Sequence, residues 1–415
     1  MDKKILIIGN SASTYALAKK LSEKHEVFVA PGNDTIKEFA DCVDIRETSA
    51  TELLDFALEN SIDMTIPISE ATLKTDIVEL FNKNNLSIFA PSINASKLIT
   101  DKAYMKKLLY KLRIPTPKFG IFEKQNMTID YIKNLKNPYL IKTNDKSSAT
   151  IFTNASMSKN IVESLFVEKN QKLIIEDYIW GSPFALYVIT DGYKALPLNS
   201  SIIHKYSLEG DGGQLTTGMG ACVPNYKLSI DNEFFILNNV VYPIIEFLER
   251  ENNPYIGILG INGLITEDGR IQIVSFDNFM QDCDTAAILA NLDMDFYQLA
   301  EACTIGSFSD EVESIPTSQL SSTSIVLTCK NKDNKNNVIE GLDNLDENIV
   351  KTFYPTVQKN RYLEYEVQNG PALVLTSIAR TSASSTKKVY QETQNINFSG
   401  IFYRKDICKT INADF

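Results

Sequence analysis

Carboxylate and hydroxyl side chains gather at the end of a predicted β-hairpin that spans residues 255–285. An Asp-Gly pair supplies the turn, and the strand after it alternates. One face of that strand is predicted to carry Ile271, Ile273, Ser275 and Asp277. Asp282 and Asp284 follow in a short loop. Oxygen ligands at a strand end suit Mg²⁺, which binds carboxylates together with phosphate oxygens. An ordinary hairpin with a solvated acidic loop fits the same spacing, and the spacing alone favours it.

Two further segments carry candidate nucleotide contacts. Lys142 ends a predicted strand and faces a Ser/Thr-rich loop, so it is a candidate phosphate ligand, although most lysines are simply solvated. Residues 172–181, KLIIEDYIWG, are an apolar strand that ends in two acids and a hinge. The backbone of such a hinge can bind the edge of an adenine. A core strand with Trp180 as packing, or as a lid over a pocket, is the alternative.

Glycine is concentrated in residues 210–220, GDGGQLTTGMG. Dense glycines let backbone amides approach an anion closely. His204 and Lys205 lie just upstream and add polar and cationic groups. A mobile surface loop is the alternative, but the apolar residues that continue the segment argue against it.

The first ~100 residues alternate strands and helices, which predicts a doubly wound parallel α/β sheet. The predicted strands are residues 4–8, 26–30, 64–68 and 87–90. Ligands of such sheets bind beyond the carboxyl ends of the strands. The first loop there, residues 9–14, lacks a complete GxGxxG pattern. Its Ser and Thr side chains either hold a phosphate or cap the next helix.

The rest of the chain has a different pattern. A long amphipathic helix is expected at residues 231–251, and the Ser/Thr/Pro-rich residues 307–324 are typical of a linker. The last ~90 residues, with strands at 324–329 and 372–379 and a helix at 384–393, predict a small α+β domain. The polar residues 330–348 are expected to form a loop with one poorly formed helix.

Composition excludes several classes of function. The net charge of −11 argues against general nucleic-acid binding, which needs a positive surface. The six cysteines are scattered without a CxxC pair, so we expect neither a zinc site nor a disulfide scaffold. This use of cysteine fits a protein of the reducing cytosol. No apolar run is long enough for a signal peptide or a membrane span, which predicts a cytoplasmic protein. Two histidines leave little room for a histidine-centred triad.

Several segments match a known family in the same order along the chain. They are residues 9–21 (GNSASTYALAKKL), 28–33 (FVAPGN), 69–77, 89–92, 101–103, 216–224 (TTGMGACVP) and 400–407 (GIFYRKDI). With these motifs the chain resembles the phosphoribosylamine–glycine ligases (glycinamide ribonucleotide synthetases) of the ATP-grasp superfamily. In that family, residues 216–224 correspond to Thr-Gly-Gly-Met-Gly-Ala-Tyr-Ser-Pro.

The resemblance implies an architecture and a reaction. Residues 1–100 would form a substrate-binding domain, residues 101–310 an ATP-grasp domain with a lid at about 115–185, and residues 311–415 a small α+β domain. ATP would lie between two antiparallel sheets with Mg²⁺ or Mn²⁺. Glycine would form an acyl phosphate, and phosphoribosylamine would displace the phosphate to give an amide. The partners would be small molecules, and the protein would bind neither nucleic acid nor a membrane. It would be a monomer or a dimer.

Site residues follow from the resemblance position by position. The expected ATP ligands are Lys102, Lys142, Glu176, Tyr178 and Ile179. The expected substrate ligands are Glu70, His204, Lys205, Asp211, Gly218 and Gly220. Asp277 is the expected metal ligand, with Ser275 as a weaker one. No catalytic side chain is assigned, because the reaction needs positioning and charge neutralisation rather than an enzyme nucleophile.

Some motif positions differ from the family. The glycines and lysine of the family's lid motif are absent from residues 147–152, and only Lys146 nearby offers a cation. The family's ribose-binding Glu has no acidic counterpart in residues 181–184, its metal-binding Glu is Ser275, and its first loop is replaced at residues 11–15. Two alternatives therefore stay open: a non-catalytic relative, or a ligase of the same chemistry with another amine or acid.

Overall fold

The computed structural model describes residues 2–144, 149–153, 155–167, 172–306, 308, 314–329, 337–354, 357–367 and 370–409. The N-terminal part is a four-stranded parallel sheet in the order β3-β2-β1-β4. Its strands are β1 (Lys4–Gly9), β2 (Glu26–Pro31), β3 (Asp41–Cys42) and β4 (Met64–Pro67). Helices α1 (Ala12–Ser22), α2 (Ala50–Glu59) and α3 (Ile77–Lys83) and short 3-10 turns at Ile36–Glu38 and Thr72–Lys74 lie between or after the strands.

The first strand is buried on both faces. Ile5 and Ile7 pack in the core that contains α1, whereas Leu6 and Ile8 pack in the core that contains α2 and α3. Helices therefore cover both faces, which is the usual environment of a continuous apolar strand. The predicted doubly wound sheet is confirmed.

The predicted strand at residues 87–90 is wrong. An isolated parallel bridge joins Ile88 to Thr65, and no longer strand forms there. Pro91 follows immediately and has no backbone N–H with which to extend the ladder.

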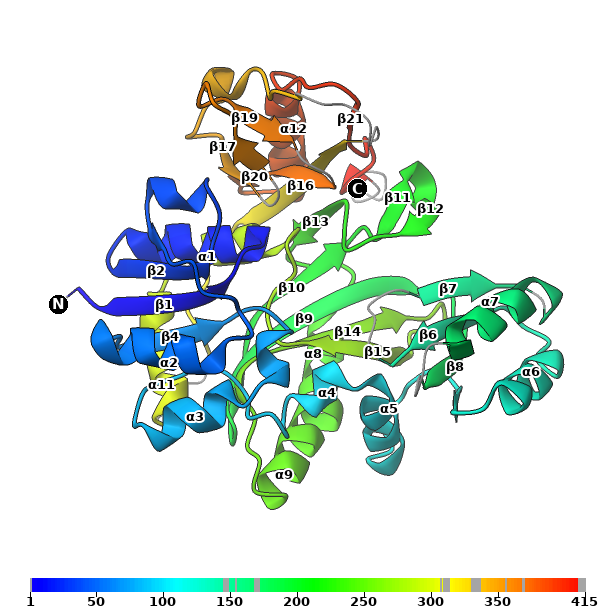
Figure 1. The fold of residues 1–415 in the computed structure, drawn as a ribbon. Helices are drawn as coiled ribbons and strands as arrows, with labels where there is room; N and C mark the ends of the chain where they lie inside the picture. Colours follow the sequence, from blue (N-terminus) through cyan, green and yellow to red (C-terminus); the bar gives the residue numbers. More distant parts are fainter. Residues whose placement is uncertain are drawn as a thin grey trace.

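A second, antiparallel sheet forms a separate lobe in the order β5-β8-β6-β7. It follows the short α4 (Lys97–Thr100) and α5 (Lys102–Lys111). Its elements are β5 (Phe119–Phe122), α6 (Gln125–Lys133), β6 (Tyr139–Thr143), β7 (Ala149–Phe152), α7 (Ala155–Val167) and β8 (Leu173–Asp177). Figure 1 shows this lobe at the far end of the molecule from the N-terminal sheet. Of the predicted lid motif at 147–152, residues 147 and 148 lie outside the described residues, as does Lys146.

A nine-stranded sheet joins the central and C-terminal parts in the order β15-β14-β9-β10-β13-β16-β20-β17, with β21 beside β16. Its strands are β9 (Ser182–Asp191), β10 (Ala195–Ile203), β13 (Gly220–Val223), β14 (Ile256–Ile265), β15 (Ile271–Asp277), β16 (Ser321–Cys329), β17 (Val350–Phe353), β20 (Pro371–Ala379) and β21 (Ile401–Phe402). Two small hairpins stand beside it: β11 (Tyr206–Leu208) with β12 (Gly212–Leu215), and β18 (Val357–Lys359) with β19 (Tyr365–Val367). Because β13 pairs with β16, backbone hydrogen bonds link the two sides of the predicted domain boundary near residue 310. The boundary itself stays a prediction.

Helices pack against this sheet. They are α8 (Ile230–Ile236), a π-helical turn (Leu237–Val241), α9 (Tyr242–Arg250), α10 (Thr285–Ala290), α11 (Phe296–Thr304) and α12 (Ser382–Thr393), with 3-10 turns at Glu209–Asp211 and Leu342–Asn344. The segment from α8 to α9 matches the predicted amphipathic helix.

The predicted linker at 307–324 is wrong at its end, since β16 already begins at Ser321. Residues 330–336 of the expected polar loop lie outside the described residues.

The cysteine prediction needs a correction. Cys222 and Cys408 form a disulfide, although 186 residues separate them along the chain. The sequence offers no spacing that would reveal such a pair, because the contact depends on the C-terminal segment returning to β13. Among the described residues, no helix has the length and apolar character that a bilayer span requires.

Candidate active site

A cavity of about 1780 Å³ lies where the N-terminal sheet, the lid lobe, the β14–β15 hairpin and the β11–β12 hairpin meet. Most of the residues predicted as ligands line it. They are Lys102, Lys142, Glu176, Tyr178, Ile179, Glu70, His204, Lys205, Asp211, Ser275 and Asp277. The volume exceeds the 300–1,000 Å³ that is usual for one small ligand, so the cavity has room for a nucleotide and a second substrate.

Gly218 and Gly220 are not among the residues that line the cavity. A Cβ atom on Gly218 would lie 2.5 Å from the Cys283 Sγ, and one on Gly220 would lie 2.5 Å from the Ser324 carbonyl oxygen. Both residues also have positive φ angles, 138° and 156°. These glycines therefore allow β13 to pack tightly behind the cavity wall.

Glu176 is the centre of a buried ion-pair network. Its carboxylate is 1% exposed and binds the Lys106 Nζ at 2.9 Å and the Lys142 Nζ at 2.7 Å. Burial alone would raise the pKa of Glu176, but the charges of Lys142 and Lys106 outweigh burial and hold that pKa below its usual value. Burial lowers the pKa of Lys106, with the Glu176 charge opposing it. The Glu176 side chain thus orients two lysines.

Lys106 is a site residue that the sequence interpretation missed. It lies on the buried face of α5, and its Nζ also donates to the Thr116 hydroxyl at 2.7 Å. The available signal was a lysine among the apolar positions of an amphipathic helix, where a charge needs a buried partner. Lys102, at the start of the same helix, donates from Nζ to the Thr143 carbonyl at 3.3 Å.

Within the described residues, the hinge after β8 presents open backbone donors. The Tyr178 N–H donates to the Pro138 carbonyl at 2.9 Å. In the described part of the chain, the Ile179 N–H has no hydrogen-bond partner. Trp180 is 72% exposed and meets the Tyr178 ring edge-on, with 4.7 Å between the ring centroids. It lines the cavity mouth rather than packing in a core.

The β14–β15 hairpin departs from the predicted alternation. A β-bulge at Asn262/Gly263 shifts the register, so that Asn262 pairs with Ser275 and Gly263 with Ile273. Ile271 and Ile273 pack in the core beside α9, together with Phe276. The prediction that they share a face with Ser275 and Asp277 is therefore wrong. Bulges are common next to functional sites because they redirect side chains, and here Ser275 and Asp277 line the cavity.

Two amides hold the Asp277 carboxylate. The Asn262 Nδ2 and the Gln281 Nε2 each donate to its Oδ2 at 2.7 Å. The Asn262 Oδ1 is buried and has no hydrogen-bond partner among the described residues. Turning the amide around would place two oxygens against each other, so the contact with Asp277 fixes its orientation. The unpaired oxygen and the carboxylate form an all-oxygen donor set that fits a hard divalent cation.

Asp282 and Asp284 do not join this donor set. Asp282 Oδ1 accepts hydrogen bonds at 2.8 Å from both the backbone N–H and the hydroxyl of Ser13. Asp284 is fully buried, accepts from the Tyr187 and Ser201 hydroxyls at 2.9 and 2.6 Å, and is not a cavity residue. Burial raises the pKa of Asp284 to about 7, against the lowering effect of those two hydroxyls.

The first loop caps its helix. The Ser11 hydroxyl accepts from the Thr14 N–H, and the Thr14 hydroxyl accepts from the Ser11 N–H. The capping alternative for residues 9–14 therefore accounts for these two side chains. Ser13 links the loop to Asp282, which brings the N-terminal sheet against the β14–β15 side of the cavity.

The glycine-rich segment is a hairpin held by the C-terminal residues. Arg404 is 1% exposed and pairs with Asp211 at 3.0 Å and with Asp406 at 2.7 Å. The Gly210 N–H donates to the Asp406 Oδ2 at 2.8 Å. Asp211 therefore has a structural partner as well as a place on the cavity wall. The sequence interpretation missed Arg404, although it lies within the matched segment 400–407.

Comparisons with known proteins agree with this geometry. Profiles of the phosphoribosylglycinamide synthetase N domain and ATP-grasp (A) domain match residues 3–98 and 100–285. A phosphoribosylamine–glycine ligase from Fusobacterium nucleatum is 27% identical, over 97% of this chain and 98% of its own.

Two solved structures share the fold. The phosphoribosylamine–glycine ligase of Thermotoga maritima has a TM-score of 0.82 at 18% identity, over 97% of this chain and all of its own. The biotin carboxylase domain of the Hydrogenobacter thermophilus 2-oxoglutarate carboxylase, solved with the magnesium salt of ADP and bicarbonate, has a TM-score of 0.74 at 14% identity, over 97% and 92% of the two chains.

Proposed function

The chain belongs to the phosphoribosylglycinamide synthetase family, and from that premise we propose that it joins glycine to phosphoribosylamine in cytoplasmic purine synthesis, with ATP converted to ADP and phosphate. The observation that carries the proposal is the meeting of two groups in one cavity: the Glu176-bound lysines at one side and the Asn262–Asp277 pair at the other. A ligase that activates a carboxylate with ATP needs both, because cations must offset negative charge while the phosphate is transferred.

The reaction has two steps. A carboxylate oxygen of glycine attacks the γ-phosphorus of ATP, the bond to the β-phosphate oxygen breaks, and ADP leaves. The amine of phosphoribosylamine then attacks the carbonyl carbon of the acyl phosphate, phosphate leaves, and the nitrogen loses a proton. Neither step requires an enzyme nucleophile, so the protein contributes alignment and charge. Removing one such stabilising group typically costs about 10²–10³ in rate.

The nucleotide is proposed to lie between the lid lobe and the nine-stranded sheet. The Ile179 N–H is the donor for the adenine edge, since it has no partner among the described residues. Lys142 reaches the phosphates from the end of β6, and its bond to the Glu176 Oε2 at 2.7 Å keeps the ammonium at the cavity wall. Lys102 is the second phosphate ligand.

Asp277, the Asn262 Oδ1 and the Ser275 hydroxyl are proposed to hold Mg²⁺ or Mn²⁺. When bound, the cation supplies charge neutralisation for the β- and γ-phosphates. Asp277 and Asn262 would thereby replace the carboxylate that the family motif has at Ser275. Glu70, His204, Lys205 and Asp211 are the proposed substrate contacts, because they line the same cavity.

Complementation tests this function in a living cell. A strain that needs purines because it lacks this ligase should grow without purines when it expresses the chain. The Lys142→Met variant should fail to restore growth at equal soluble expression. Absence of growth with well-expressed wild-type protein would contradict the proposal.

A further inference from the structure

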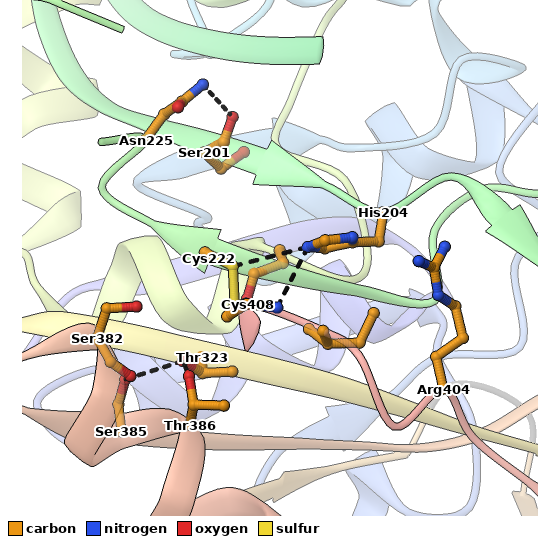
Figure 2. Close-up of a disulfide and its surroundings, with 12 residues drawn as sticks. Ser201, His204, Cys222, Asn225, Thr323, Ser382, Ser385, Thr386, Arg404 and Cys408 are labelled. Atoms are coloured by element: carbon orange, nitrogen blue, oxygen red, sulfur yellow. Dashed lines mark hydrogen bonds between the residues drawn. A yellow bond between two sulfur atoms is a disulfide. The ribbon is translucent and has the colours of Figure 1, made fainter. Parts of the chain in front are cut away.

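Figure 2 shows two sulfurs bonded between β13 and the segment that follows β21. Cys222 and Cys408 are each 1% exposed, and their Cα atoms are 5.9 Å apart. We propose that Cys222 and Cys408 form a reversible thiol–disulfide site that exchanges with small disulfides and dithiols from the cavity, and that its oxidation state controls how firmly residues 404–408 hold the β11–β12 hairpin. The control part of this inference rests on the proposed function, whereas the exchange chemistry does not.

One of the two cysteines belongs to the cavity wall. Cys222 and His204 are among its lining residues, and Cys408 is not. A small reagent therefore meets Cys222 first. In the family motif a tyrosine stands at the position of Cys222, so this sulfur is a feature of the chain's own sequence rather than of the motif. Burial raises the pKa of the Cys42, Cys283 and Cys303 thiols, which lowers the fraction of each that is thiolate at pH 7.

His204 lies beside both sulfurs. Its Nε2 is 3.8 Å from the Cys222 Sγ and accepts the Cys408 backbone N–H at 3.3 Å. Because Nε2 acts as an acceptor, the ring proton resides on Nδ1. Burial, followed by the charge of Arg404, lowers the pKa of His204 to about 4, so the ring is neutral at pH 7. In the reduced protein the Cys222 thiol would compete with the Cys408 N–H for this one acceptor.

The exchange balances without a further reactant. Cys222 attacks one sulfur of a small disulfide RSSR, the RS–SR bond breaks, and RSH leaves with the thiol proton of Cys222. Cys408 then attacks the Cys222 sulfur of the mixed disulfide, and a second RSH leaves with the proton of Cys408. A dithiol reverses both steps, returns two protons to the cysteines and leaves as a cyclic disulfide.

Hydrogen bonds connect the sulfur pair to the cavity wall. Arg404 and Asp406 lie two to four residues before Cys408, and they hold Asp211 and Gly210 on the hairpin. Gly210 and Asp211 line the cavity. On the other side, the Ile407 N–H donates to the Tyr390 hydroxyl at 3.0 Å, and a Cβ on Gly220 would lie 2.9 Å from the Ile407 side chain. The disulfide fixes the end of this segment to β13 covalently.

Thiol counting tests the exchange directly and needs no turnover. Protein purified without reductant, denatured and alkylated should have four modified cysteines and a peptide pair linked through Cys222 and Cys408. After dithiothreitol all six should react, and oxidised glutathione should restore four. The proposal would be overturned if untreated protein has six thiols and treatment with glutathione disulfide does not oxidise two of them. Six thiols with one retained equivalent of zinc would also overturn it and indicate a metal site instead.

Amide exchange tests the coupling. Reduction should speed exchange in residues 404–408 and 206–211 by about threefold or more, and leave the β1–β4 sheet unchanged. The Cys222→Ser/Cys408→Ser variant should exchange like the reduced protein and ignore reductant, while Cys329→Ser should respond like the wild type. If the double variant does not fold, Cys408→Ala alone serves the same purpose. Equal exchange in both oxidation states would refute the coupling, whether or not the protein shows ligase activity.

Turnover adds a separate readout. If the chain is an active ligase, reduction should raise the KM for a substrate several-fold in the wild type and in Cys329→Ser, with no effect in the double variant. An active enzyme whose KM is the same in both oxidation states would contradict control of the site. A wholly inactive protein would count against the proposed function. The thiol count and the amide exchange would still show whether the Cys222–Cys408 pair is a redox site.

Discussion

Asn262 on β14 donates from Nδ2 to the Asp277 Oδ2 on β15 at 2.7 Å, beside the only β-bulge between these two described strands. The contact leaves the amide oxygen of Asn262 buried and without a partner among the described residues. A buried, unpaired carbonyl oxygen costs about 1–3 kcal/mol, which a bound cation would offset. The pair is therefore the feature on which the proposed metal site depends.

Replacing Asp277 with alanine should lower kcat/KM for ATP by about 10²–10³, because the site loses its carboxylate ligand. The Mg²⁺ concentration for half-maximal rate should rise as well. Steady-state ADP formation across a Mg²⁺ titration measures both effects. Asp268→Ala is the matched control, since Asp268 lies in the exposed turn of the same hairpin and pairs with Arg270. Unchanged metal dependence in Asp277→Ala would contradict the assignment.

Replacing Asn262 with alanine should weaken Mg²⁺-dependent ATP binding without a large loss of stability. The change removes the unpaired oxygen and one of the two donors to Asp277, and a lost hydrogen bond of this kind costs about 1 kcal/mol. Calorimetric titration with ATP in the presence and absence of Mg²⁺ separates the loss of the metal ligand from the loss of the hydrogen bond to Asp277. We expect weaker binding with Mg²⁺ and the same binding without it. A loss that is equal in both conditions would indicate a general packing defect.

The two lysines on Glu176 should behave differently when each is replaced with methionine. Lys106 is 1% exposed, so Lys106→Met leaves part of a buried charge unpaired and should destabilise the fold by about 3–5 kcal/mol. Lys142 is 11% exposed and faces the cavity, so Lys142→Met should mainly reduce turnover. Urea unfolding and steady-state rates separate the effects. The reverse pattern would show that Lys106, rather than Lys142, is the phosphate contact.

Much of the fold was predictable from the sequence because its signals are local. Continuous apolar runs placed β1, β2 and β4, whereas the two-residue β3 was missed, and the Asp-Gly turn placed the β14–β15 hairpin. The predicted strand at 87–90 failed because Pro91 cuts its pairing to one bridge, which apolar content does not reveal.

The lining of the cavity was predictable where a residue lies near the end of a regular strand. Lys142 and Glu176 follow from strand ends, but their direct contact depends on antiparallel pairing of β6 with β8. Asn262 was missed because the bulge at Val274 in β15 brings Ser275 and Asp277 to its side, and a bulge of this kind has no clear sequence pattern. Burial of Asp284 and the joining of Cys222 to Cys408 both depend on packing between distant segments.

Asp284 should make stability depend on pH. Its pKa is about 7 in the folded protein against a usual 3.8, so the folded state holds a proton that the unfolded chain has released. The free energy of unfolding should therefore fall as pH rises from about 4 to 7, by at most roughly 1.4 kcal/mol per unit. Asp284→Asn cannot ionise and should lack this slope, as urea unfolding across the range would show.

Ser201→Ala supplies a second test of the same group. Losing the 2.6 Å hydrogen bond from the Ser201 hydroxyl should raise the pKa of Asp284 further and extend the slope above pH 7. Parallel pH profiles for the wild type and Asp284→Asn would rule out this carboxyl as the source.

The most direct test of the account is the ligase reaction itself. Pure protein with ATP and Mg²⁺ should form ADP only when both glycine and phosphoribosylamine are present, with glycinamide ribonucleotide detected by mass spectrometry in equal amount. The rate should fall in Asp277→Ala and persist in Asp268→Ala. No substrate-dependent ADP or product at high enzyme concentration would contradict the account and favour a non-catalytic relative.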